Sequence, residues 1–162
     1  LRGPLVAVSG RDVAELSARL AEAGLRGRAL EIEAEIEPGQ ATEVGLSVRR
    51  GRQDETRVGY DVARRELYVD RSRSGAVAFH PAFAARHRAP LPLEDGRLRL
   101  RVLVDASSVE VFGGGGRVVL TELVFPGEGS DGVALFARGG RTGLVTVRAW
   151  RLSPAGGSSR RK

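Results

Sequence analysis

Alternation of apolar and polar positions dominates the centre of the chain. Between Leu98 and Val104 every second residue is Leu or Val, with Arg99 and Arg101 in between. This period of two predicts a strand with one buried face. A turn-forming Asp-Ala-Ser-Ser segment and a run of four glycines separate it from two further strand patterns. The resulting β-meander comprises, in order, Leu98–Val104, Asp105–Ser108, Val109–Phe112, Gly113–Gly116 and Val118–Val124.

The same period recurs along most of the chain. In Leu30–Ile36, Leu, Ile and Ala alternate with glutamate, which predicts a half-buried strand. Further strands are expected where Val, Leu, Ile and Tyr recur between short polar turns. These are Val44–Val48, Thr56–Asp61, Glu66–Asp70, Val133–Ala137 and Leu144–Leu152. About nine or ten short strands at this spacing, with at most one helix, predict an all-β antiparallel β-sandwich.

The N-terminal segment follows a different pattern. Leu1–Ser9 is either a strand or the end of a linker. A helix is expected to begin at Ser9, with Asp12 completing a capping box, apolar residues at helical spacing and Gly24 just beyond the end. We therefore divide the chain into a linker and N-terminal segment (1–28), a β-sandwich domain (29–153) and a disordered tail (154–162).

Gly75–Pro92 is the longest stretch without a strand pattern, and it is expected to be an irregular loop. It contains both histidines, His80 and His87. Neither belongs to a paired metal-binding motif and the chain has no cysteine, so no metal site and no cofactor are predicted. The glycine run at Gly113–Gly116 lacks the lysine of a phosphate loop and is expected to join two strands.

Charge and composition narrow the classes of partner. The formal net charge is +6, but Arg160, Arg161 and Lys162 at the end of the chain supply three of these charges. Aromatic residues make up only 5%, so a basic face with stacking aromatics for nucleic acid is not predicted. No apolar run reaches the about 20 residues of a membrane span. Because the chain begins at Leu1 and has no methionine, we expect it to be a processed or excised piece.

Catalysis by the chain itself would need a pair of carboxylates held across a substrate. Asp105 and Glu110 flank one turn and are the candidates. The alternative, which we favour, is that Asp105 caps its own turn while Glu110 faces solvent or an arginine.

Several motifs resemble the C-terminal β-sandwich of glycoside hydrolase family 32, the invertases, levanases and inulinases. These motifs are VGYDVARRELYVDRSRSG (58–75), FHPAFAARHRAPL (79–91), VDASSVEVF (104–112), VVLTELVFP (118–126) and DGVALFA (131–137). The resemblance runs from about Ala29 to Leu152. It implies a jelly-roll or concanavalin-like sandwich that stabilises or packs on a five-bladed propeller preceding it. In this family the segment before the sandwich is usually extended, which conflicts with the predicted helix.

The resemblance also implies that the catalytic carboxylates lie on the propeller, in Asn-Asp-Pro, Arg-Asp-Pro and Glu-Cys motifs. This chain has no asparagine, no cysteine and no Arg-Asp-Pro sequence, so none of these residues can be carried over. We therefore expect a non-catalytic domain of a fructan- or sucrose-cleaving β-fructosidase. The partner is expected to be the propeller, with a homodimer as an alternative. A fructan substrate would place the parent outside the cell, whereas sucrose cleavage can be cytoplasmic.

A second hypothesis is an autonomous carbohydrate-binding module for the terminal fructose of levan or inulin, as in the related family 66 modules. Aromatic faces stack on sugar rings, and Asp and Arg can bond vicinal hydroxyls. Tyr60, Asp70, Arg71 and Arg73 are the candidate ligand residues. The alternative interpretation, which we favour, is an internal Asp–Arg network that holds a strand to a loop.

Overall fold

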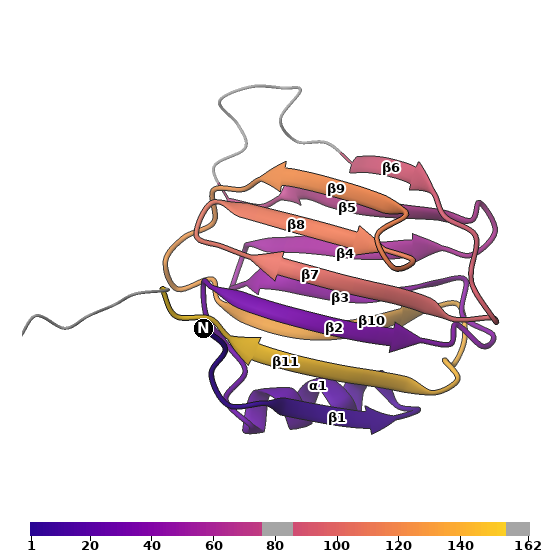
Figure 1. Cartoon of the computed structure of the whole chain (residues 1–162), viewed down its shortest axis with the longest axis horizontal. Coiled ribbons are helices and arrows are strands. Elements are labelled where there is room, and N and C mark those ends of the chain that lie inside the picture. Colours follow the sequence, from indigo (N-terminus) through magenta and orange to yellow (C-terminus); the bar gives the residue numbers. More distant parts are fainter. Residues whose placement is uncertain (76–85, 155–162) are drawn as a thin grey trace, which may run out of the picture.

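The computed structural model describes residues 1–75 and 86–154, and these form two stacked antiparallel sheets (Figure 1). One sheet has six strands in the order β1-β11-β2-β7-β8-β9, and the other has five in the order β10-β3-β4-β5-β6. The predicted β-sandwich is confirmed. The strands are β1 (Val6–Gly10), β2 (Leu30–Ile36), β3 (Glu43–Arg50), β4 (Glu55–Asp61), β5 (Glu66–Arg73), β6 (Arg86–Pro90), β7 (Leu98–Val104), β8 (Ser108–Gly113), β9 (Val118–Leu123), β10 (Gly132–Arg138) and β11 (Val145–Arg151).

The core lies between the two sheets and is built from the residues that the alternation selects. In β2, Leu30, Ile32 and Ile36 are buried. The glutamates between them lie on the outer face, where Glu33 and Glu35 are half-buried and Glu31 is covered. Leu100 and Val102 of β7 pair with β2 residues and bury the same face. The apolar side chains of β3, β4 and β5 fill the space from the opposite sheet. The predicted meander is also confirmed, since β7, β8 and β9 are neighbours in sequence and in the sheet.

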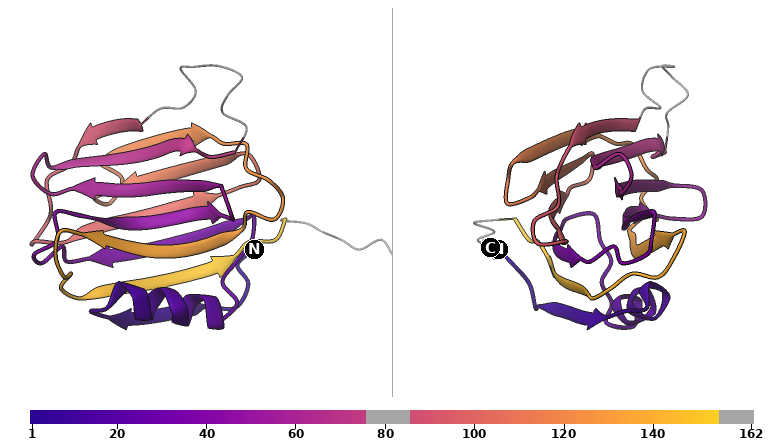
Figure 2. Two further views of the ribbon diagram at one scale, coloured as in Figure 1. Left: turned by 180° about the vertical axis from the view of Figure 1, so that it is seen from behind. Right: turned by 90° about the vertical axis from the view of Figure 1, so that its right-hand side faces the viewer.

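Residues expected to form a linker and N-terminal segment contribute a strand and a helix. β1 pairs with β11 at the edge of the six-stranded sheet, and α1 (Val13–Glu22) packs along the bottom of the sandwich (Figure 2). The expected helix is therefore present, but its start was predicted wrongly. Asp12 is the N-cap, and its carboxylate accepts from the amides of Ala14 and Glu15, whereas Ser9 belongs to β1. Gly24 follows the helix with φ of 73°, as expected.

The prediction of an irregular loop over Gly75–Pro92 is partly wrong, because Arg86–Pro90 form β6 and pair with β5. β6 lies at the edge of its sheet and its side chains are mostly exposed. Its sequence therefore shows no alternation of apolar and polar residues, and Pro90 at its end is a residue that normally interrupts strands. Residues 76–85, which include His80, lie outside the described part of the chain, as do residues 155–162 of the expected tail. The division of the chain into segments stays a prediction.

Candidate functional site

The sequence-predicted ligand residues do not converge on one surface. Tyr60 points into the core, is fully buried, and donates its hydroxyl to the carbonyl of Leu91 at 2.6 Å. Burial raises the pKa of Tyr60. Arg73 lies exposed at the end of β5. Asp70 and Arg71 are adjacent in β5, so they point to opposite faces of the sheet. Whether any of these four residues binds a ligand stays a prediction.

Asp70 is held by its neighbours on the outer face of the five-stranded sheet. Its carboxylate accepts from the amide of Ser72 at 2.9 Å and its hydroxyl at 2.6 Å. Arg86 of β6 donates to its other oxygen at 3.1 Å. Burial raises the pKa of Asp70, but the hydrogen bonds from Ser72 and Arg86 outweigh it and leave this pKa below its usual value. These contacts form an internal Asp–Arg pair that joins β5 to β6, whereas the alternative interpretation expected a network between a strand and a loop; that interpretation stays a prediction.

Arg71 joins the two sheets at their upper edges. Its guanidinium lies 3.3 Å from the carboxylate of Glu122 and donates to the carbonyl of Leu123 at 3.2 Å. Glu122, on β9, is nearly buried, and its other oxygen contacts Nδ1 of His87 on β6. An acid between an arginine and a histidine from the facing sheet therefore ties β9 to β5 and β6. No group of three or more side chains suited to a metal ion occurs in the described ranges 1–75 and 86–154.

Tyr68 is an aromatic side chain on the outer face that is nevertheless covered. Its ring lies against Gly59, where a Cβ would stand 2.3 Å from the ring. Its hydroxyl bonds to the carboxylate of Glu43, and the guanidinium of Arg86 stacks 4.2 Å from the ring centre. Because only 1% of Tyr68 is exposed, its face is occupied by Arg86 and is not open to a sugar ring.

Asp105 and Glu110 line one hollow of about 470 Å³ together with Leu103, Ser108 and Leu152. The carboxylate of Asp105 accepts from the amide of Ala106 at 2.7 Å. It thus caps its own turn, as the favoured interpretation predicts.

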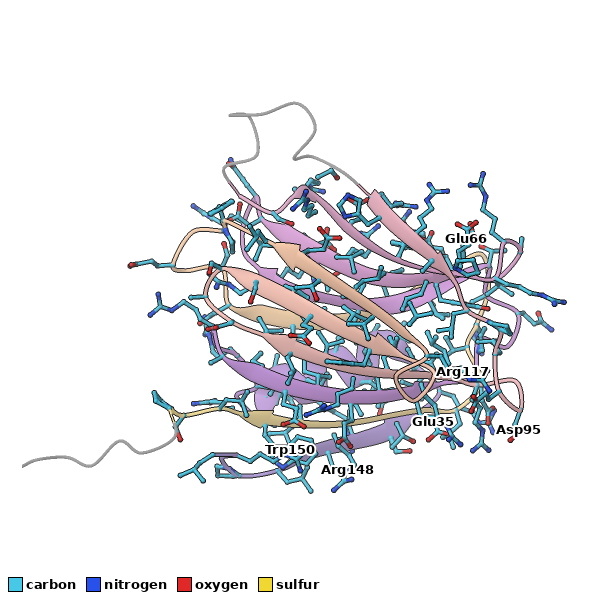
Figure 3. The ribbon with its side chains drawn as sticks, turned by 45° about the horizontal axis from the view of Figure 1, so that its top comes forward. Glu35, Glu66, Asp95, Arg117, Arg148 and Trp150 are labelled. Atoms are coloured by element: carbon cyan, nitrogen blue, oxygen red, sulfur yellow. The ribbon has the colours of Figure 1, made fainter. Side chains whose placement is uncertain are left out.

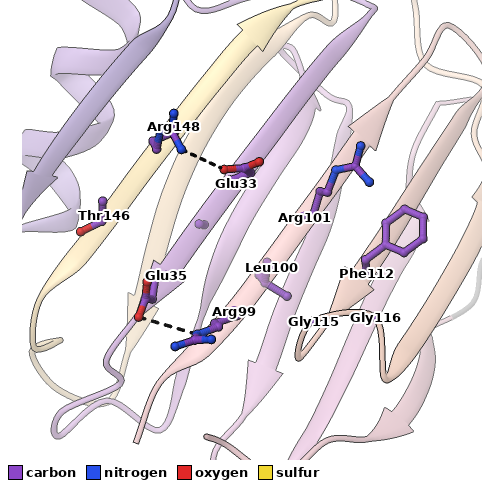
Figure 4. A pocket seen from close by; sticks show the side chains of 11 residues that line it. Glu33, Glu35, Arg99, Leu100, Arg101, Phe112, Gly115, Gly116, Thr146 and Arg148 are labelled. Atoms are coloured by element: carbon purple, nitrogen blue, oxygen red, sulfur yellow. Dashed lines mark ion pairs between the residues drawn. The ribbon is translucent and has the colours of Figure 1, made fainter. Parts of the chain in front are cut away.

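A second hollow, of about 530 Å³, is a groove across the outer face of the six-stranded sheet (Figure 4). Its floor comes from β11, β2, β7 and β8, and the glycine-rich turn between β8 and β9 forms one end. We call this the outer groove. Its lining residues are Glu33, Ala34, Glu35, Arg99, Leu100, Arg101, Phe112, Gly115, Gly116, Thr146 and Arg148.

Strand register explains why these side chains meet. Glu33 is paired with Arg148 on one side and with Arg101 on the other. Arg101 is in turn paired with Phe112. One row of side chains thus runs across four strands, which spans about 14 Å at the usual strand spacing. A second row holds Thr146, Glu35 and Arg99 in the same order.

The rows carry alternating charge. Arg148 lies 3.5 Å from Glu33, and Arg99 lies 3.8 Å from Glu35 (Figure 4). Beside them, Arg148 also contacts the ring of Trp150, its neighbour along β11 (Figure 3). Sequence reasoning missed the outer groove because its residues come from strands far apart in the chain. The signal present in the sequence was the pair of alternating charged rows, Glu31 to Glu37 and Arg97 to Arg101.

Known proteins that resemble this chain are longer, and the chain matches one part of them. A family model described as "Glycosyl hydrolases family 32 C terminal" matches residues 6–151. Levanase of Bacillus subtilis (strain 168) is 46% identical over 135 residues, covering 82% of this chain and 20% of that protein. Levanase of Bacillus sp. (strain L7) is 43% identical over 132 residues, covering 80% of this chain and 14% of that protein. The chain thus spans a fifth or less of the length of either levanase.

A solved structure shares the same architecture. The crystal structure of exo-inulinase from Aspergillus awamori superposes with a TM-score of 0.76 and 25% sequence identity. The superposition covers 94% of this chain and 28% of that chain. No helix among residues 1–75 and 86–154 is long and apolar enough to cross a membrane.

Proposed function

Because this chain belongs to the family of glycosyl hydrolase family 32 C-terminal domains, we propose that it is the non-catalytic β-sandwich of a longer hydrolase. The parent enzyme cleaves fructan or sucrose, and the sandwich packs on and stabilises the five-bladed catalytic propeller. Two relatives that match most of this chain are levanases several times its length. Their length supports a catalytic part outside the matched region.

The carboxylates described in this chain support a role outside catalysis. Asp105, one of the two candidate acids, accepts a hydrogen bond from its own turn. The sequence contains none of the Asn-Asp-Pro, Arg-Asp-Pro or Glu-Cys motifs that the family resemblance implies for the catalytic acids. The hydrolytic step is therefore assigned to the part of the parent that precedes the sandwich.

An apolar strip along β9 is the observation that carries the packing role. Val119 is 50% exposed and Leu123 is 56% exposed, and both point outward from the same strand. β9 is an edge strand, and large apolar side chains along an edge normally lie against another element. We call Val119 and Leu123 the β9 strip. Since the levanase relatives are several times longer than this chain, the propeller is the partner that we assign to this strip.

The experiment compares matched substitutions in the longer hydrolase and in the isolated chain. Leu123→Ser should lower the melting temperature of the longer enzyme but leave that of the isolated chain nearly unchanged. Burial of a leucine contributes about 1.5–3 kcal/mol, so the loss should be measurable by calorimetry. Leu144→Ser is the control, because Leu144 is 38% exposed and lies outside β9.

Three results would count against this function. Equal melting of the longer enzyme and its Leu123→Ser variant would remove the strip as the packing surface. A Leu123→Ser variant that splits a homodimer of the chain, seen by size exclusion, would assign the strip to self-association. Release of sugar from sucrose, levan or inulin by the isolated chain would contradict the non-catalytic role.

A further inference from the structure

We propose that the outer groove is a binding site for a neutral, polyhydroxylated sugar chain, laid across β11, β2, β7 and β8. The choice of fructans as its first probes rests on the proposed function. The site itself rests on the geometry of the groove, and it is distinct from the candidate residues Tyr60, Asp70, Arg71 and Arg73 that the sequence suggested.

The arginines of the groove have many hydrogen-bond donors to offer. Arg101 donates through Nε to Glu31 at 3.2 Å. Within the described residues its two terminal amino groups, and the whole guanidinium groups of Arg99 and Arg148, donate no hydrogen bond to protein. Each guanidinium carries five N–H groups in a planar fork. Such forks can donate to two neighbouring hydroxyl oxygens at once.

Glutamates beside these arginines supply acceptors and set the charge of the ligand. Glu33 and Glu35 are each about a third exposed and lie within 4 Å of an arginine. A sugar hydroxyl between the two side chains can accept a hydrogen bond from the arginine and donate one to the glutamate. An anionic ligand would meet the carboxylates at equally short range, so the paired charges favour a neutral ligand.

Phe112 and the β8–β9 turn give the groove an apolar end. Arg101 lies 5.6 Å from the ring centre of Phe112, which places the aromatic ring beside the row of donors. Gly115 and Gly116 have φ of 69° and 93°, and among the described residues a Cβ at either would meet no atom within 4 Å beyond its chain neighbours. This end is therefore open and bare of side chains, so a sugar ring can approach Phe112. A volume of about 530 Å³ lies within the usual range for ligand sites.

Affinity electrophoresis of the purified chain tests the site. Gels contain levan, inulin, dextran or dextran sulfate, and the retardation gives an apparent dissociation constant. We expect retardation by levan or inulin that persists in about 0.5 M salt, where simple ionic attraction is screened. Phe112→Ala should weaken binding about fivefold or more, and Gly115→Asn should do the same by filling the open end.

Gly96→Asn is the matched control for Gly115→Asn. Gly96 has φ of 70°, and a Cβ there would likewise meet no atom of a described residue within 4 Å beyond its chain neighbours; Gly96 is not among the residues that line the outer groove. Asparagine tolerates this conformation, so both variants should fold and melt alike. Only the groove variant should lose binding.

The choice of polymer tests which ligand binds, and the two variants test whether it binds in the outer groove. Retardation by dextran equal to that by the fructans supports a sugar site without fructan selectivity. No retardation by any neutral polymer, or retardation by dextran sulfate alone, overturns the sugar ligand. Binding that is unchanged in both Phe112→Ala and Gly115→Asn overturns the groove as its location. None of these results depends on the β9 strip, whose test measures the stability of the longer enzyme.

Discussion

Arg49 is an almost fully buried cation whose removal should loosen one end of the sandwich. Only 2% of it is exposed. Its Nε donates to the carbonyl of Ser130 at 2.7 Å, and its terminal amino groups donate to Ala106 at 2.8 Å and Gly127 at 3.2 Å. These carbonyls belong to the β7–β8 turn of one sheet and to the segment before β10 of the other. Arg49 therefore ties together turns that are far apart in sequence.

The size of its contribution follows from two opposing terms. Each hydrogen bond from a charged donor contributes about 1.5–3 kcal/mol. Burial of a guanidinium costs several kcal/mol, and the same burial lowers the pKa of Arg49 below its usual value. Replacement by Met keeps the stem but removes the donor from the carbonyls of Ala106, Gly127 and Ser130, and from that of Asp105, which is 3.5 Å away. We expect Arg49→Met to lower the free energy of unfolding by about 3 kcal/mol, because three hydrogen bonds from a charged donor are lost and the carbonyl of the buried Ser130 is left unpaired.

Calorimetry and hydrogen exchange can measure this loss. For a domain of this size, a loss of about 3 kcal/mol lowers the melting temperature by about 6–12 °C. Arg50→Met is the control, since the neighbouring Arg50 is exposed and its loss should cost less than about 0.5 kcal/mol. In Arg49→Met, the amides of residues 127–131 should also exchange faster. Equal melting of the two variants would refute the reasoning, because the desolvation cost would then cancel the hydrogen bonds.

Two further predictions concern the outer faces of the sheets. Gly59→Ala should cost about 1–3 kcal/mol by calorimetry, because its Cβ would stand 2.3 Å from the ring of Tyr68. Gly129→Ala should cost almost nothing, because no atom of the described part of the chain, beyond its chain neighbours, lies within 4 Å of the new Cβ. The hydrogen bond from Arg2 lowers the pKa of Glu31, so its stabilising effect is present above the unfolded pKa of about 4.3 and is lost as pH falls through the lower folded pKa. The melting temperature of Glu31→Gln should therefore lie below that of the unsubstituted chain at pH 7, and the two should converge in acid. A difference in melting temperature that persists in strong acid would contradict this.

The strands could be predicted wherever one face is buried and the other is solvated. In β2 the glutamates alternate with Leu30, Ile32 and Ile36, and the structure buries the apolar set. The same logic applies to β7. β6 could not be predicted in this way, because a mostly exposed edge strand has no buried face and so no alternation of apolar and polar residues. Tyr60 shares the parity of buried Val58, so the alternation was a signal for a core position that the choice of Tyr60 as a ligand residue did not use.

The outer groove needed information that local patterns do not contain. Glu33, Arg101 and Arg148 are separated by dozens of residues, and only the register of β2 with β7 and β11 brings them into one row. A shift of one residue in either pairing would send one set of these side chains into the core. Sequence alone gives the parity of each strand, whereas the alignment between strands is decided by the packing of the whole sheet.

Two parts of the charged outer face can be assigned different roles by their burial. Exposed ion pairs contribute only about 0–1 kcal/mol each, so the pairs of Glu33 and Glu35, about a third exposed, do little for stability. Glu31 is only 6% exposed by its side chain and lies between Arg2 and Arg101. Its loss would leave a nearly buried site between two cations. Substitutions at Glu31 should therefore change melting more than binding, while substitutions at Arg99 or Arg148 should change binding more than melting. If the outer groove binds sugar as proposed, one sheet surface combines a stabilising ion-pair cluster around Glu31 with arginine donors for a ligand at Arg99 and Arg148.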